Sequence, residues 1–160
     1  MAKTTWSEFF RKWGFSSIKL NVGFAEVEFA PKEDDQTCAW YMYVEMITRI
    51  TTQPLEPDTG DEKTALNSVY SLFDTTRAIL KDKGREAPTF TKVAVIILNQ
   101  IVRPFTAKWH KKSLDGYLDS NEGKEEFREE LALLQTDLKN YTKMLADLAK
   151  VEDLTEAVEV

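Results

Sequence analysis

The sequence is poor in the residues that carry most metal and catalytic chemistry. Among its 160 residues, Cys38 is the only cysteine and His110 is the only histidine. One cysteine excludes an intrachain disulfide and a cysteine-based zinc site. One histidine excludes the ferritin-like di-iron bundle, which needs a Glu-x-x-His motif on each of two helices. The sequence therefore predicts no metal and no cofactor.

Long hydrophobic runs are also missing. The longest, residues 93–98, is far shorter than the roughly 20 apolar residues of a membrane-spanning helix. Residues 1–10 lack the apolar stretch of a secretory signal. Together with the single cysteine, these absences predict a cytoplasmic protein that makes no contact with membranes. The net charge of −6 argues against a simple nucleic-acid coat and against binding to an anionic membrane surface.

The motifs of common enzymes do not occur. Neither Gly-x-Gly-x-x-Gly nor Gly-x-x-x-x-Gly-Lys-Ser/Thr is present. No pair of carboxylates stands within an apolar stretch, where burial would raise a pKa. Cys38 and His110 could in principle pair as nucleophile and base, but two isolated residues on different predicted helices are weak evidence, and we favour a buried Cys38. We therefore predict a non-enzymatic protein.

The clearest positive pattern lies near the C-terminus. Seven apolar residues follow one another at alternating spacings of 4 and 3, which is the a/d pattern of a long helix with one apolar face. This face must be covered by other helices of the chain or by a second copy. The residues are Phe127, Leu131, Leu134, Leu138, Tyr141, Leu145 and Leu148.

The whole pattern predicts a mainly α protein with a single domain over residues 1–151. Its core is a bundle of about four longer helices over residues 34–151, preceded in residues 1–31 by a short helix and a β-hairpin. The helices are expected at residues 34–52, 60–83, 88–103 and 122–149. A capping box of Thr59 and Glu62 is expected to begin the second, and Pro104 to kink or end the third. Residues 152–160 form an acidic C-terminal tail.

The hairpin is predicted from a change of period between residues 17 and 29. Ile18, Leu20, Val22 and Phe24 alternate with polar or small residues, and the alternation then slips by one residue after Gly23. Such a slip is typical of two strands around a turn, or of one bulged strand.

Aromatic residues are concentrated in the N-terminal part of the chain. Ten of the 18 aromatic residues lie within the first 43 positions, more than a short helix and a hairpin need for a core of their own. Some of them are expected to be exposed and to anchor a partner. The residues predicted to bind a partner are Trp6, Phe9, Phe10, Trp13 and Tyr41. On the helix expected at residues 34–52, the inner face is predicted to consist of Trp40, Tyr43, Val44, Ile47 and Ile50.

A basic segment at residues 103–112 is the candidate site for a nucleic acid or another anion. It has no acidic residue, and it combines positive charges with two rings that could stack on bases. The alternative, which we favour, is an ordinary basic helix end with Trp109 turned inward. The candidate residues are Arg103, Lys108, Trp109, His110, Lys111 and Lys112.

Three arginines suggest a second candidate site. Arg49, Arg77 and Arg103 each lie in an otherwise apolar or threonine-rich stretch of a predicted helix. If they converge, they would line a pocket for an anionic small molecule. The alternative is three separate boundary arginines, which we favour.

These observations lead to one functional prediction and two alternatives. The prediction is a non-enzymatic adaptor or accessory subunit of a larger cytoplasmic assembly, binding a protein partner or forming a homo-oligomer. The alternatives are a helical subunit that contacts nucleic acid through residues 103–112, and a binder of an anionic small molecule between the three arginines.

Overall fold

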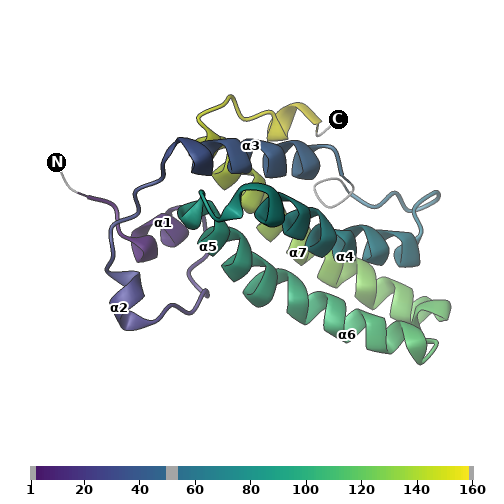
Figure 1. The fold of residues 1–160 in the computed structure, drawn as a ribbon. Helices are drawn as coiled ribbons and strands as arrows, with labels where there is room; N and C mark the ends of the chain where they lie inside the picture. Colours follow the sequence, from purple (N-terminus) through teal and green to yellow (C-terminus); the bar gives the residue numbers. More distant parts are fainter. Residues whose placement is uncertain (1–2, 50–53, 159–160) are drawn as a thin grey trace.

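The computed structural model describes residues 3–49 and 54–158, and it is built mainly of helices (Figure 1). Two short helices come first, α1 (Trp6–Lys12) and α2 (Val22–Ala25). The longer ones are α3 (Glu33–Ile47), α4 (Glu62–Ile79), α5 (Pro88–Ile97), α6 (Arg103–Leu114) and α7 (Asn121–Ala149). None of the helices described is long and apolar enough to cross a membrane.

Polar residues at the first turns explain where the helices begin. The hydroxyl of Thr5 accepts from the backbone N–H of Glu8, and the Glu8 carboxylate accepts from that of Thr5, which makes a capping box for α1. Asp61 caps α4 by accepting from the N–H of Thr64 at 2.8 Å, and Ser120 caps α7 in the same way.

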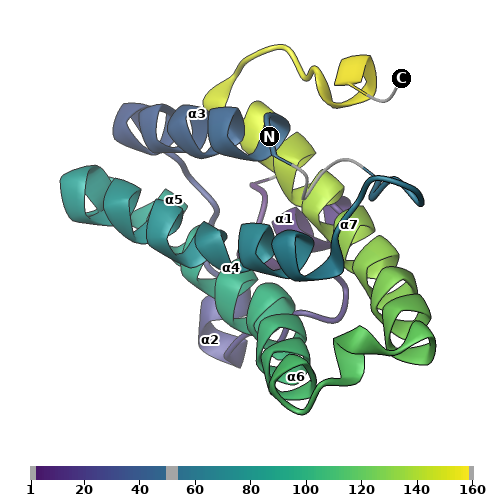
Figure 2. The same ribbon diagram turned by 90° about the vertical axis from the view of Figure 1, so that its right-hand side faces the viewer.

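The apolar face of α7 is buried within the single chain. All seven residues of the a/d pattern have at most a small exposed fraction, and α7 packs mainly against α3. Figures 1 and 2 both show α3 crossing the C-terminal end of α7. The apolar face of α7 is therefore covered by the chain's own helices and does not serve as a coiled-coil contact with a second copy.

The prediction of a β-hairpin is wrong. Within residues 3–49 and 54–158 no β-strand forms, and the only trace of pairing is an isolated bridge between Thr5 and Glu28. The stretch around Lys19 has no regular secondary structure, and its backbone bonds to a side chain: the amide of Gln100 accepts from the Lys19 N–H and donates to its carbonyl, both at 2.8 Å. Asn21 then caps the short helix α2, which ends the alternating pattern.

Helices α5 and α6 form one rod that is interrupted by a wider turn. Residues Leu98–Val102 adopt a π-helix, in which the N–H of Arg103 bonds to the carbonyl of Leu98, five residues earlier. Pro104 follows directly, and its ring would clash with the carbonyl four residues before it in a regular α-helix. The wider turn accommodates the proline, so the rod neither ends nor breaks there.

The linker before α4 is held by one arginine of α7. The guanidinium of Arg128 donates to the backbone carbonyls of Leu55 and Gly60, each at 3.2 Å, and to the carboxylate of Glu62 at 3.0 Å. Since these acceptors lie on both sides of the helix start, Arg128 fixes the linker against α7.

Cys38 is expected to be chemically silent in the folded protein. Its side chain has no exposed surface, and burial raises the pKa of its thiol to about 11. Because the reactive species is the thiolate, we expect almost no reaction with an aromatic disulfide reagent near neutral pH, and one equivalent after unfolding in denaturant. Absorbance of the released thiol measures both. Rapid reaction without denaturant would show that α3 opens easily.

Candidate functional site

Three of the predicted partner anchors belong to the core. Trp6, Phe9 and Phe10 are buried, and their rings pack on aromatic residues that follow α1. Phe9 stacks on Phe29 with ring centroids 3.7 Å apart, and Trp6 lies 4.7 Å from Phe24. Trp13 is half-buried, so only Tyr41 among the five predicted anchors is exposed. The concentration of aromatics near the N-terminus thus builds a local core.

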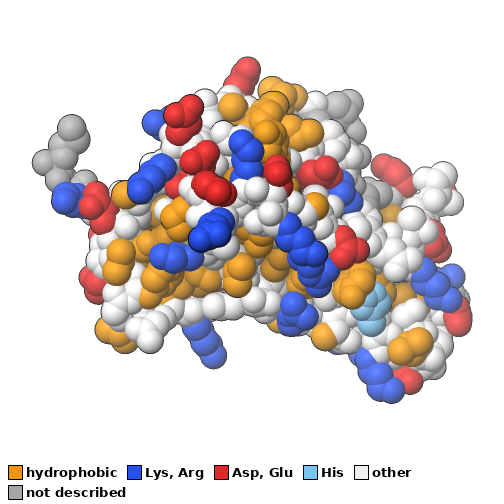
Figure 3. All heavy atoms as spheres, viewed as in Figure 1, with side chains coloured by type: hydrophobic (Ala, Val, Ile, Leu, Met, Phe, Trp, Pro, Cys, Tyr) orange, Lys and Arg blue, Asp and Glu red, His pale blue; other side chains and the backbone are white. Residues whose placement is uncertain are grey.

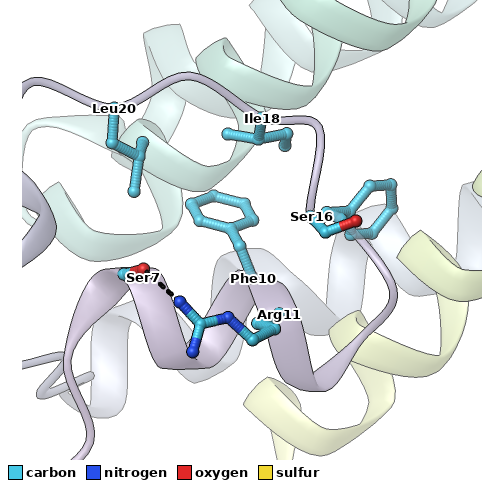
Figure 4. Close-up of a pocket in the computed structure, with 7 residues that line it drawn as sticks. Ser7, Phe10, Arg11, Ser16, Ile18 and Leu20 are labelled. Carbon is cyan, nitrogen blue, oxygen red and sulfur yellow. Dashed lines mark hydrogen bonds between the residues drawn. The ribbon is translucent and has the colours of Figure 1, made fainter.

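A hollow beside α1 is too small to bind a ligand. Figure 4 shows Phe10 of α1 facing Ile18 and Leu20 of the stretch that follows this helix, with Arg11 donating to Ser7 at 3.4 Å. The hollow measures about 50 Å³. Ligand pockets are roughly 300–1,000 Å³, so this space is suited to water alone.

Most of the basic segment is engaged by acids of α7. Trp109 is fully buried, and its Nε1 donates to the carboxylate of Glu130 at 2.6 Å. Lys108 pairs with the same carboxylate, and Lys112 lies 3.3 Å from that of Glu126. Neither the predicted stacking ring nor these two lysines are available to a nucleic acid in this conformation.

The other three residues of the segment face outward. Arg103 bonds to Asn99 at 3.1 Å, and Lys111 pairs with Asp115 at 3.2 Å. The ring of His110 meets that of Tyr70 edge-on, with centroids 4.7 Å apart. The outer face of α6 therefore keeps a weaker basic character than the sequence indicates.

The contact between Tyr117 and Glu126 predicts a measurable pH dependence. The Tyr117 hydroxyl donates to the Glu126 carboxylate at 2.7 Å; this bond, with help from Lys112, lowers the pKa of Glu126 and raises the pKa of Tyr117 to about 12. The stabilisation from Glu126 is present above its unfolded pKa and is lost as pH falls through the lowered one. That from Tyr117 is lost between about pH 10 and 12.

The Glu126→Gln variant tests this contact. Without the carboxylate, the pKa of Tyr117 is expected to fall from about 12 towards the ordinary value of 10.0. Tyrosine NMR with assigned ring signals measures it residue by residue, and Tyr70, on the far side of α6, serves as the internal reference. An unchanged Tyr117 titration would contradict the role of this hydrogen bond.

The three arginines of the second candidate site do not converge. Arg77 and Arg103 both lie over the ring of Phe73, at 5.8 and 4.8 Å. Arg49 instead donates to Ser71 and Thr75, at 2.7 and 2.9 Å. These two residues are two positions before and after Phe73, on the opposite face of α4. The arrangement is that of boundary arginines, two on one side of α4 and one on the other.

The exposed face of α3 is the feature that the sequence interpretation missed. The structure buries Cys38, Ala39, Met42, Tyr43 and Met46, whereas Trp40, Tyr41 and Val44 are 44%, 41% and 39% exposed. The predicted inner face was wrong for Trp40 and Val44, and Ile50 lies outside the described residues. The buried side of α3 carries smaller and more flexible side chains, and one of them, Met42, contacts Thr76 of α4.

A groove runs beside this face. It measures about 470 Å³ and lies between the first half of α3 and the end of α7; its lining residues are Glu33, Gln36, Thr37, Trp40, Tyr41, Ala149 and Val151. Residues 151–158, here called the C-terminal segment, follow it. Lys150 adopts a left-handed φ of 58° and turns this segment back from α7.

The C-terminal segment is attached to α3 rather than free. The hydroxyl of Tyr43 accepts from the backbone N–H of Leu154 at 2.7 Å, and Thr155 is buried. Lys143 of α7 also pairs with Glu156 at 3.4 Å. The described part of the predicted acidic tail is therefore attached to α3 and α7, and only Val151, which precedes it, lines the groove. Figure 3 shows hydrophobic, acidic and basic side chains side by side in the upper part of the molecule.

Comparisons with protein-family models, with curated proteins and with solved structures found no match. Among the described residues, no group of histidine, cysteine, aspartate and glutamate side chains is arranged to hold a metal ion. The face of α3 and its groove are thus assessed on their geometry and chemistry alone.

Proposed function

We propose that this protein is a non-enzymatic interaction subunit of a larger cytoplasmic assembly, and that it contacts its partner through the exposed face of α3. The observation that supports this is the contiguous exposure of Trp40, Tyr41 and Val44 beside a groove. Neighbouring exposed aromatics are uncommon on a surface with no contact to make, and tryptophan and tyrosine dominate the binding energy of interfaces.

The two alternatives have less support. A nucleic acid at residues 103–112 could not stack on Trp109, because this ring is buried. Lys108 and Lys112 are also engaged, because they pair with acidic residues of α7. Binding of an anionic small molecule needs three arginines around one pocket, and Arg49 lies across α4 from Arg77 and Arg103. The face of α3 has no comparable conflict with the chain's own packing.

Site-specific photocrosslinking in the cells that produce the protein tests the proposal. A photoreactive benzoylphenylalanine replaces Tyr41 on α3 in one strain and Tyr70 on α4 in the other. The two tyrosines are matched controls, since they are 41% and 47% exposed. We expect a discrete crosslinked product from position 41 and none of that mass from position 70.

A second change shows whether the product depends on the face itself. Adding Trp40→Ser to the position-41 strain is expected to abolish the crosslink, because the neighbouring anchor is lost. The proposal is refuted if position 41 gives no discrete product, or if the same product forms equally from position 70. Mass spectrometry of the product distinguishes a different protein from a second copy of this chain.

A further inference from the structure

We propose that the groove beside α3 binds a basic segment of a partner protein, with a lysine or arginine of that segment against Trp40 and Tyr41. This inference rests on the proposed function, and it adds the chemistry of the partner. It follows from the charge around the groove, from the rings that line it and from the attachment of the chain that follows it.

The charge around the groove is one-sided. Helix α3 contains four acidic residues and no basic residue, although Asp35 is buried and Glu45 pairs with Arg49. The C-terminal segment contains three acidic residues and no basic one, and one of them, Glu156, pairs with Lys143. Glu33, Asp34 and Glu152 are exposed, and none of them forms an ion pair within the described part of the chain. Lys32 and Lys150 flank the two segments and leave the excess of negative charge in place. Such a surface attracts a cationic partner and repels an anionic one.

The rings of the groove suit the same partner. Trp40 and Tyr41 line it together with Glu33, so aromatic faces and a carboxylate border one space. A lysine ammonium or an arginine guanidinium is attracted to the face of such a ring, most strongly to that of tryptophan. The carboxylate supplies a charge-assisted hydrogen bond to the same cation. The apolar stem of a lysine or arginine can meanwhile pack on Val151 and Ala149.

The chain that follows the groove is already attached to the protein before a partner binds. The bond between Tyr43 and the N–H of Leu154, the burial of Thr155 and the pair between Lys143 and Glu156 attach the C-terminal segment at three points. These attachments hold the chain beyond Val151, so Val151 lines the groove without a cost of ordering this segment on binding. At about 470 Å³ it has room for a long side chain with an apolar neighbour.

Selection from a library of random 12-residue peptides displayed on phage tests the inference with the full chain. Enriched peptides are synthesised, and their affinities are measured for the wild-type protein and for three variants. The variants are Trp40→Ser, the groove charge reversal Glu33→Lys/Glu152→Lys, and the matched reversal Glu122→Lys/Glu125→Lys at the opposite end of α7. Circular dichroism confirms that each variant is folded.

Peptides rich in lysine and arginine are expected. Their affinity should fall about tenfold or more in Trp40→Ser and in the groove charge reversal, and should stay within about twofold in the matched reversal. Added salt should also weaken the binding of these peptides to the wild-type protein.

Failures of the two proposals give different results. If the enriched peptides are neutral or acidic but still require Trp40, the proposal of a basic segment is refuted and the proposed contact through α3 remains. Peptides that bind Trp40→Ser as well as the wild type overturn both. The absence of any enriched peptide also refutes the proposal of a basic segment. The crosslinking experiment then decides whether a partner binds to the exposed face of α3.

Discussion

The Trp109→Ala variant is expected to lose about 3–5 kcal/mol of unfolding free energy, which is the usual cost of removing a large buried aromatic side chain. Trp109 has no exposed surface. It stacks on Tyr117 with centroids 6.2 Å apart, meets Phe127 edge-on at 5.1 Å, and donates to Glu130. Since domains of this size are stable by only about 5–15 kcal/mol, a large share of the total is lost.

Urea denaturation followed by circular dichroism measures this loss. Lys111→Ala, two positions away on the exposed side of α6, is the control and is expected to change stability by less than about 0.5 kcal/mol. Trp109→Phe keeps a ring but leaves the Glu130 carboxylate without its indole donor, so its stability should lie between those of the two alanine variants. A Trp109→Ala protein as stable as the control would show that α6 and α7 are held by other contacts.

The Asp35→Ala variant is expected to lose about 2–4 kcal/mol, because two backbone N–H groups lose their acceptor. Asp35 has no exposed surface. One carboxyl oxygen accepts from the N–H of Lys32 at 2.8 Å, and the other accepts from that of Phe90 at 2.9 Å. The first bond closes the start of α3 and the second fixes the start of α5, so a single side chain joins two helix termini.

Asp34→Ala is the matched control for this variant. The neighbouring carboxyl group is exposed, and its removal is expected to cost less than about 0.5 kcal/mol. Asp35→Asn keeps one acceptor oxygen and should have intermediate stability. Amide hydrogen exchange at Phe90 gives an independent measurement, since its protection is expected to fall in Asp35→Ala alone. Equal stability of the two alanine variants would contradict the joining role of Asp35.

The long helices could be predicted because their apolar residues lie on one face only. The spacing of Phe127, Leu131 and Leu138 leaves one orientation for α7, and the structure buries each of them. The same holds for Leu66, Val69 and Phe73 on α4. A pattern of this kind records both the period of a helix and the side that meets the core.

The orientation of α3 could not be predicted in the same way. Cys38, Ala39 and Met42 are apolar on one side, and Trp40 and Val44 are apolar on the other. Periodicity then indicates a helix without indicating which side is buried. Large aromatics suggested the core, but the structure buries Cys38, Ala39 and Met42 and leaves Trp40 at the surface. For this reason the candidate site was predicted only at Tyr41, while Trp40 was assigned to the interior.

The stretch near Lys19 shows a second reason why a sequence pattern can mislead. Its alternating apolar residues predicted a strand, and a strand needs a backbone partner. Here the side chain of Gln100 satisfies both backbone groups of Lys19. A contact over 81 positions between a side chain and a backbone leaves no periodic trace in the sequence. The sequence pattern therefore predicted a strand that does not form, and it gave no sign of the contact with Gln100.

The π-helical turn at Leu98–Val102 is a position where the chain could lose one residue and remain helical. A π turn has one residue more than an α turn of the same span, so the faces of α5 and α6 are rotated against each other although the chain stays helical between them. Loss of one residue here would restore regular helix geometry and turn α6 by about 100° relative to α5. Homologues of different length at this position would therefore share the rod and differ in which residues α6 presents to solvent.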